Sequence, residues 1–167
     1  MRLAAPEPLG NRHVVGEFDC GVASLNEWLK RRAAQNQLSG ATRTFVAADL
    51  DSHQVGAYYA LAPSAITPDR ATGRFRRNMP DPIPVVVLAR LAIHNRFQGQ
   101  GLGRALFQDA ARRVLHAGET IGIRGLIVHA LSDEARDFYL KIGLDPSPLE
   151  PLTLMTTIVD LRAALGN

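Results

Sequence analysis

Three glycines at alternate positions, Gly99, Gly101 and Gly103, constrain this chain more than any other feature. They lie in residues 96–104, Arg-Phe-Gln-Gly-Gln-Gly-Leu-Gly-Arg, directly after an apolar segment over 85–94 that predicts a buried, central strand. A helix is predicted to follow over about 103–116. Because glycine has no Cβ, such a turn can curl until several backbone N–H groups point into one concavity. Those donors and the positive end of the helix would hold a phosphate or pyrophosphate.

This turn matches the known glycine-rich phosphate-binding motifs only in part. A P-loop needs Gly-Lys followed by Ser or Thr, which is absent here. A dinucleotide-binding turn needs G-x-G-x-x-G, usually after the first strand, whereas here the third glycine comes one position early and two predicted strands precede it. A tight strand-to-helix turn with no ligand therefore stays open as the alternative.

The remaining pattern predicts a mixed α/β (α+β) fold with a partly antiparallel sheet. Ser24 and Glu27 are spaced as a capping box and open a predicted helix over 24–37, whose apolar face includes Trp28. Segments 42–50 and 54–64 predict a hairpin, 65–84 a loop, 125–131 a second buried strand and 152–161 a last strand. Ser132 and Gly143 are expected to cap and end a helix over 133–142. With no linker, residues 1–167 are predicted to form one domain.

Composition excludes several classes of protein. A single cysteine, Cys20, cannot form an intramolecular disulfide or a four-cysteine zinc site, so no metal is expected and a cytoplasmic location is the default. The longest apolar run, 84–93, contains Arg90 and is too short to cross a bilayer, and the first residues lack the apolar run of a signal peptide. We therefore expect no membrane partner.

Positive charge is concentrated in the middle of the chain. Residues 70–136 carry a net charge of +6, although the whole chain carries only +3. This imbalance indicates a polyanionic partner, either a phosphorylated cofactor or a nucleic acid. A bias of composition is the alternative, since 17 of the 19 basic residues are arginines.

Three motifs in order resemble the GCN5-related N-acetyltransferases (GNAT family). Gln98-x-x-Gly101-x-Gly103 is similar to the family's pyrophosphate turn, the strand before it ends in Leu91-Ala92-Ile93, and residues 133–144 are similar to the family's Ala-x-x-Phe-Tyr-x-x-x-Gly-Phe segment. The resemblance implies a GNAT fold, with a mixed, mostly antiparallel sheet whose splayed central strands are flanked by helices. It implies an acetyl-CoA-dependent N-acetyltransferase whose cofactor contacts are Leu91, Ala92, Ile93, Gln98, Gly99, Gln100, Gly101, Leu102, Gly103, Arg104 and Ser132. Ser132 stands where many members carry Asn.

A narrower resemblance covers nearly the whole chain. Residues 18–29, 119–125 and 128–139 are similar to the TacT-type toxins of type II toxin–antitoxin modules. This resemblance implies acetylation of the α-amine of aminoacyl-tRNA, which blocks translation. It also implies neutralisation by a ribbon–helix–helix antitoxin and binding of operator DNA only through that complex. A homodimer is expected as well, with the apolar helix around Trp28 or the C-terminal strand as the contact.

Tyr139 is the candidate catalytic residue. By family analogy its phenol lies near the thioester sulfur, and a phenol of ordinary pKa ~10 can donate a proton to a thiolate of pKa ~8.5. No carboxylate stands out as a general base, which mildly favours an α-amine of pKa ~7.7–8 over a lysine amine as the acceptor. For His94 and His129, strand-end packing or exposure is the expected role.

Six arginines are candidates for binding RNA. Three of them lie in the basic stretch 70–77, whose Phe75 could stack on a base. The other three, Arg31, Arg32 and Arg90, are expected to extend it into a groove for an acceptor stem. The six are Arg31, Arg32, Arg74, Arg76, Arg77 and Arg90. A solvated loop is the alternative for 70–77. Two other functions remain open: an acetyltransferase of a small-molecule amine or protein N-terminus, and a subunit that mainly helps an antitoxin repress its operator.

Overall fold

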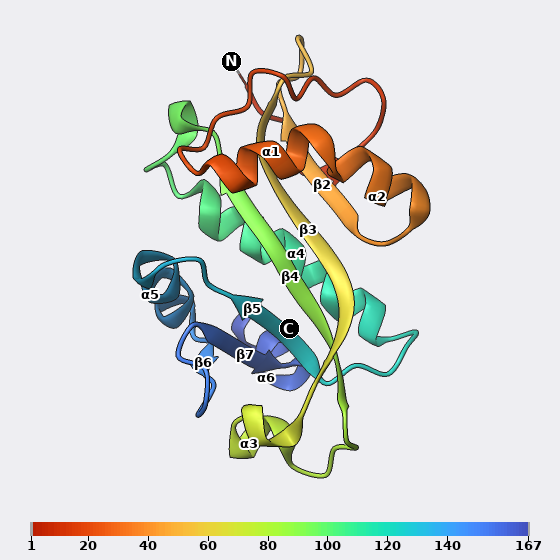
Figure 1. Cartoon of the computed structure of the whole chain (residues 1–167), viewed down its shortest axis with the longest axis vertical. Coiled ribbons are helices and arrows are strands. Elements are labelled where there is room, and N and C mark those ends of the chain that lie inside the picture. The colour runs from red at the N-terminus through yellow and green to blue at the C-terminus, as the bar shows by residue number, and fades with distance from the viewer. Residues whose placement is uncertain (1, 167) are drawn as a thin grey trace. The chain divides into compact units, whose positions relative to one another are not determined.

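A computed structural model describes residues 2–166, so the two terminal residues of the predicted 1–167 domain lie outside it. Among these residues the strands form one seven-stranded sheet in the order β1-β2-β3-β4-β5-β7-β6 (Figure 1). Strands β4 and β5 are parallel, whereas β1–β2, β2–β3, β5–β7 and β6–β7 are antiparallel. The prediction of a mixed, mostly antiparallel sheet is confirmed.

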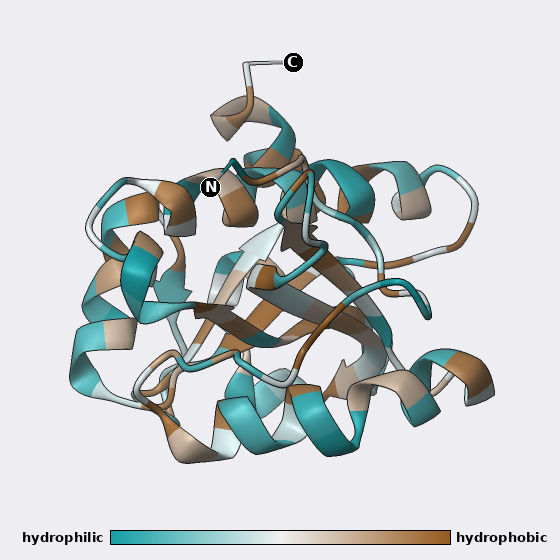
Figure 2. Cartoon of the chain, turned by 90° about the horizontal axis from the view of Figure 1, so that it is seen from above, coloured by the Kyte–Doolittle hydropathy of each residue, from teal (hydrophilic) through white to brown (hydrophobic). Residues whose placement is uncertain are grey.

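The elements alternate between strands and helices along the chain. The strands are β1 (Glu7–Pro8), β2 (Arg43–Ala48), β3 (Val55–Ile66), β4 (Ile83–Ile93), β5 (Gly125–His129), β6 (Asp145–Pro146) and β7 (Thr153–Thr157). The helices are α1 (Ala23–Arg31), α2 (Ala33–Ser39), α3 (Gly73–Arg76), α4 (Leu102–Gly118), α5 (Asp133–Ile142) and α6 (Ile158–Ala164), with short 3₁₀ turns η1 (Pro68–Arg70) and η2 (Asn95–Phe97). Figure 2 shows that strands are mostly apolar, whereas helices carry both polar and apolar stretches.

Contacts divide the chain into two compact units. The first contains the residues up to Ala62 together with Ala89–Asp109, and the second contains Pro63–Leu88 together with the residues from Ala110 onward. Strands β3 and β4 and helix α4 each contribute residues to both. A single domain over the whole chain stays a prediction.

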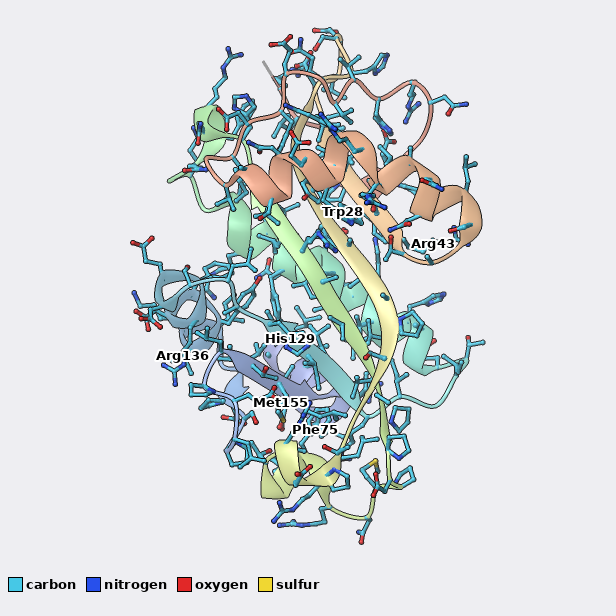
Figure 3. The ribbon with its side chains drawn as sticks, viewed as in Figure 1. Trp28, Arg43, Phe75, His129, Arg136 and Met155 are labelled. Atoms are coloured by element: carbon cyan, nitrogen blue, oxygen red, sulfur yellow. The ribbon has the colours of Figure 1, made fainter. Side chains whose placement is uncertain are left out.

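The first unit packs α1 and α2 on an aromatic core. Trp28 of α1 stacks on Tyr58 at 5.9 Å between ring centroids, and the Tyr58 hydroxyl donates to the Leu25 carbonyl at 2.7 Å. Trp28, predicted to lie on the apolar face of its helix, is thus buried in this core (Figure 3). The long helix predicted over 24–37 is instead two helices, because the backbone leaves helical geometry at Arg32, where φ is −120°.

The predicted capping box is wrong. Helix α1 begins one residue earlier, with Val22 at the N-cap and no side-chain cap, so Ser24 lies inside the first turn. The loop before it is fixed instead by Asn26, whose side chain accepts from the Cys20 N–H at 2.9 Å and donates to Asp19 at 3.0 Å. The hydrogen bonds of the Asn26 side chain to the preceding loop thus take the place of a side-chain cap at the start of α1.

The second unit packs α3 against the β4–β5–β7 part of the sheet. Its apolar core includes Phe75, Ile127 and Met155. The predicted loop over 65–84 therefore contains η1 and α3, because Phe75 is buried and the Thr72 hydroxyl caps α3 by accepting from the Phe75 N–H. Gly125 is required where β5 meets β7, since a Cβ there would lie 2.0 Å from the Thr156 carbonyl oxygen.

In this unit the predicted ends of helix α5 are confirmed, whereas the predicted end of the last strand is wrong. Ser132 caps α5 by accepting from the Ala135 N–H at 3.1 Å, and Gly143 ends it with φ +116°, as predicted. The last strand, predicted over 152–161, ends at Thr157, whose hydroxyl accepts from the Asp160 N–H and starts α6. Within residues 2–166, no helix is both long and apolar enough to cross a membrane.

Asp49 makes stability depend on acid pH. Its carboxylate accepts from the N–H groups of Arg2 and Ser52 and from the Ser52 hydroxyl at 2.8–3.0 Å, and these hydrogen bonds, Ser52 first, lower its pKa to about 2. A depressed carboxyl pKa stabilises the fold above the unfolded-state value near ~3.9, and the contribution is lost as pH falls toward 2. Asp49→Asn should therefore lower the melting temperature at pH 7, and the difference from wild type should vanish near pH 2.

Thermal melts from pH 7 to pH 2 would measure this. Asp51→Asn is the matched control, because Asp51 lies in the same turn with an exposed side chain. A constant difference across that range would show that Asp49 acts through packing and not through its charge.

Candidate functional site

The glycine turn joins β4 to α4 within the first unit. Gly99 and Gly101 have φ of +77° and +78°, the left-handed region that L side chains rarely adopt. A Cβ at either position would meet nothing within 4 Å. Glycine is therefore needed for the backbone path and not to avoid a neighbour, and the space beside both glycines is open.

Backbone N–H donors without a partner lie directly after these glycines, at the start of helix α4. Among residues 2–166, no hydrogen bond is made by the backbone N–H groups of Gly101, Leu102 and Gly103, which open the 17-residue helix α4. A helix N-terminus leaves such donors for a ligand and carries partial positive charge. No acidic residue lies in its first turn. Donor set, charge and open space together fit a phosphate or pyrophosphate.

Gln98 braces the turn. Its side-chain amide donates to the carbonyls of Ile93 and Cys20 at 2.8 and 3.0 Å. This arrangement ties the turn to the end of β4 and to the loop before α1. Its role toward a ligand stays a prediction, as do those of its neighbours Leu91, Ala92 and Ile93 at the end of β4, and Gly99, Gln100 and Arg104 around the turn.

His94 is structural, in agreement with the sequence. Its Nδ1 accepts from the Arg96 N–H at 3.0 Å, and its ring packs edge-on against Phe18 and Phe97. Ser132 likewise uses its hydroxyl to cap α5. Whether it also contacts a cofactor stays a prediction.

Tyr139 lies on α5 in the second unit. Its side chain is 7% exposed, and its ring meets Phe138 edge-on at 5.0 Å. Burial raises the pKa of the phenol above its ordinary value of 10. The hydroxyl is therefore protonated throughout the neutral range and can act as a proton donor.

The six candidate arginines fall into two groups. Arg31, Arg32 and Arg90 belong to the first unit, where Arg31 pairs with Glu27 and the Arg90 guanidinium lies 4.3 Å from the Trp28 ring centroid. Burial lowers the pKa of Arg90. Arg74, Arg76 and Arg77 lie on or directly after α3.

Their charges are not equally free to bind an anion. Arg74 forms a two-pronged ion pair with Asp160 at 2.6 and 2.7 Å, which compensates its charge. Arg76 and Arg77 are exposed. Among the described residues, no group of three His, Cys, Asp or Glu side chains is arranged to hold a metal ion.

A mixed sheet that leads through a glycine turn into a helix with free N–H donors fits an enzyme with a phosphorylated co-substrate. Residues 41–143 match the family model described as "Acetyltransferase (GNAT) domain". The chain belongs to this family.

Among curated relatives, the chain is 43% identical over 164 residues to the "tRNA-acetylating toxin" of Mycobacterium tuberculosis, covering 98% of both chains. Among solved structures, it is similar to a Tyr-to-Phe mutant of KacT, with TM-score 0.91, 27% identity and coverage of 98% and 99%. It is also similar to AtaT complexed with acetyl-methionyl-tRNAfMet, with TM-score 0.89, 28% identity and coverage of 97% and 98%.

Further solved structures contain partners. AtaT bound to the C-terminus of the antitoxin AtaR and to acetyl-CoA matches with TM-score 0.83, 27% identity and 100% coverage of both chains. The KacTA–DNA complex matches with TM-score 0.83, 27% identity and 99% coverage of both chains.

Proposed function

We propose that this protein is the toxin of a type II toxin–antitoxin module and transfers the acetyl group of acetyl-CoA to the α-amino group of aminoacyl-tRNA. The observation that carries the proposal is the 43% identity to a tRNA-acetylating toxin over 98% of both chains. The open N–H donors of the turn support the acetyl-CoA half of the reaction. Blocked α-amines cannot form peptide bonds, so translation would stop.

Different residues supply each step. Acetyl-CoA, when bound, supplies a thioester that an amine can attack. The N–H groups of Gly101, Leu102 and Gly103 hold its pyrophosphate, and the backbone of Leu91, Ala92 and Ile93 aligns the arm that leads to the thioester. Tyr139 gives its proton to the departing sulfur, since burial keeps the phenol protonated.

The partners follow the same proposal. An antitoxin would neutralise the toxin, and the complex would bind operator DNA, since similar structures hold an antitoxin and DNA. We further propose that the antitoxin is of the ribbon–helix–helix type and that the toxin is a homodimer. Aminoacyl-tRNA as substrate places the reaction in the cytoplasm.

The decisive experiment incubates the full chain with radiolabelled acetyl-CoA and bulk aminoacylated tRNA, beside uncharged tRNA and a panel of free amines. Label on charged tRNA alone supports the toxin. Label on free amines alone would instead make the protein a small-molecule or N-terminal acetyltransferase. No label in any arm would contradict both.

The arginines near α3 should contribute unequally to tRNA binding. We expect Arg76→Ala and Arg77→Ala each to lower the slope of log K against log salt by about 0.7–0.9, the amount for one lost phosphate contact. Arg74→Ala should change the slope less, because Asp160 already compensates that charge. Salt titrations of binding to bulk tRNA would measure this, with Arg162→Ala as a control on α6. If all four variants keep the wild-type slope, Arg74, Arg76 and Arg77 do not belong to the RNA interface.

A further inference from the structure

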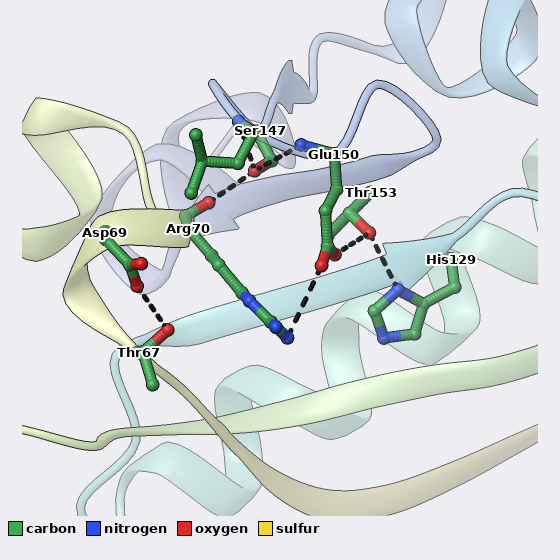
Figure 4. A network of polar contacts seen from close by, with 8 residues as sticks. Thr67, Asp69, Arg70, His129, Ser147, Glu150 and Thr153 are labelled. Atoms are coloured by element: carbon green, nitrogen blue, oxygen red, sulfur yellow. Dashed lines mark hydrogen bonds and ion pairs between the residues drawn. The ribbon is translucent and has the colours of Figure 1, made fainter.

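A chain of polar contacts in the second unit ends at an exposed histidine (Figure 4). His129 Nδ1 lies 2.9 Å from Thr153 Oγ1, and Thr153 Oγ1 lies 3.1 Å from a carboxylate oxygen of Glu150. The other Glu150 oxygen is 3.4 Å from the Arg70 guanidinium. Three segments distant in sequence, η1, β5 and the 147–153 turn, thus converge on one imidazole.

The hydrogen-bonding capacity of Thr153 fixes the tautomer of that imidazole. A hydroxyl has one proton, and here it is donated to the Glu150 carboxylate, which can only accept. Towards His129 the hydroxyl can therefore only accept, so Nδ1 must carry a proton and donate it. In the neutral ring the lone pair then lies on Nε2, for which no partner is found among residues 2–166.

The turn that carries Glu150 is held firmly. The Ser147 hydroxyl is buried, donates to the Arg70 carbonyl at 2.6 Å and accepts from the Glu150 N–H at 3.2 Å. The Thr153 N–H donates to the Glu150 carbonyl at 3.0 Å. The Glu150 carboxylate and the Thr153 hydroxyl are thus held in place by backbone contacts. In known catalytic triads a carboxylate orients the imidazole directly through Nδ1–H, and here the Thr153 hydroxyl lies between the two.

His129 also lines a cavity of about 160 Å³. Its apolar lining residues include Val85, Val87 and Ile127, and its polar lining includes Arg70, His129 and Glu150. A small organic group with one polar end fits this lining, because apolar side chains are combined with the His129 imidazole and the Arg70–Glu150 ion pair.

We propose that this cavity receives the aminoacyl group of the acceptor and that His129 Nε2 is the general base that deprotonates its α-ammonium group, with Thr153 and Glu150 as positioning residues. The inference rests on the proposed function, because it names the acceptor site of the same reaction. The sequence had favoured packing or exposure for His129, since neither Thr153 nor Glu150 is its neighbour in the chain.

The proton balance is complete. The α-ammonium group gives one proton to Nε2, and the imidazolium later releases that proton to solvent. The neutral amine nitrogen forms the C–N bond to the acetyl carbon, and the C–S bond breaks with its electron pair on sulfur. The proton that nitrogen sheds on becoming an amide balances the one that sulfur gains. One proton is released overall for each ammonium acetylated.

The test compares pH profiles of kcat/KM for the full chain and for His129→Asn, with bulk aminoacylated tRNA as the acceptor. We expect a roughly 5–10-fold lower rate near pH 7 in the variant, because only about a tenth to a fifth of an α-amine of pKa ~7.7–8 is unprotonated there. Its rate should then recover with rising pH, as the amine loses its proton without help near pH ~7.7–8. KM for acetyl-CoA should not change. His116→Asn, an exposed histidine at the end of α4, should match the wild type.

Positioning is tested separately at Thr153. Thr153→Val removes the acceptor for Nδ1–H and should lower the rate near pH 7 by less than His129→Asn does and alter the pH profile, whereas Thr153→Ser keeps the hydroxyl and should restore both. A merely structural role would lower the melting temperature without changing the profile. Glu150→Gln should act in the same direction as Thr153→Val.

The outcomes separate this inference from the function on which it rests. An active wild type and an equally active His129→Asn variant with an unchanged profile would overturn the base and leave the toxin standing. If the wild type acetylates only free amines, the toxin fails, and the same profiles on the best amine decide the role of His129. No acetylation of any acceptor would overturn both proposals.

Discussion

Tyr139→Phe should lower kcat for acetyl transfer about 10²–10⁴-fold while leaving acetyl-CoA affinity unchanged. The substitution removes one oxygen and keeps the ring, which packs edge-on against Phe138 at 5.0 Å. Only the proton donor is lost, so the leaving thiolate must depart unprotonated or wait for water. Because burial raises the pKa of this phenol, the wild-type rate should not decline through ionisation of Tyr139 as pH rises to 9. Single-turnover acetylation and acetyl-CoA titration would measure both effects.

Tyr58→Phe is the matched control. Tyr58 is fully buried, and its hydroxyl donates to the Leu25 carbonyl at 2.7 Å, so its loss removes one buried hydrogen bond. This change should cost about 0.5–1.5 kcal/mol of stability and leave kcat near the wild-type value. Equal losses of kcat in both variants would mean that Tyr139 acts through packing and not through its proton.

Local signals predicted the fold well where side chains act on their own neighbourhood. Ser132 and Gly143 bound α5 as expected, and the apolar run before the glycines became β4. The errors lie where a contact from outside the helix itself decides where the helix forms or begins. Helix α3 exists because Phe75 is buried against the sheet, and the start of α1 follows the contact of Asn26 with its preceding loop. Neither partner could be identified from spacing along the chain.

The candidate site divides in the same way. The turn around Gly101 is a continuous segment, so its positive φ and open donors follow from sequence pattern. The His129–Thr153–Glu150 chain joins residues that the sheet brings together, because β5 and β7 pair with His129 opposite Thr153. A register between strands separated by a helix cannot be read from the sequence, and His129 alone carries no sign of its role.

Gly101→Ala should weaken acetyl-CoA binding about 100-fold, the loss expected when one or two charge-assisted hydrogen bonds are misaligned. The alanine must either hold φ near +78°, at a cost of roughly 1–2 kcal/mol, or turn the backbone and redirect the N–H donors. Within residues 2–166, no atom beyond the adjacent residues lies within 4 Å of the added Cβ, so the methyl group would also enter the open space beside the turn. Calorimetric titration with acetyl-CoA would measure the affinity.

Gly143→Ala separates strain from ligand contact. Gly143 also has positive φ, at +116°, and a Cβ there likewise meets nothing within 4 Å, but it ends α5 and lies outside the turn. Both variants should therefore lose melting temperature because of backbone strain, while only Gly101→Ala should lose affinity. If both variants bind acetyl-CoA with equal affinity, the glycines are needed only for the backbone conformation of the turn. The N–H groups at the start of α4 would then not bind the pyrophosphate.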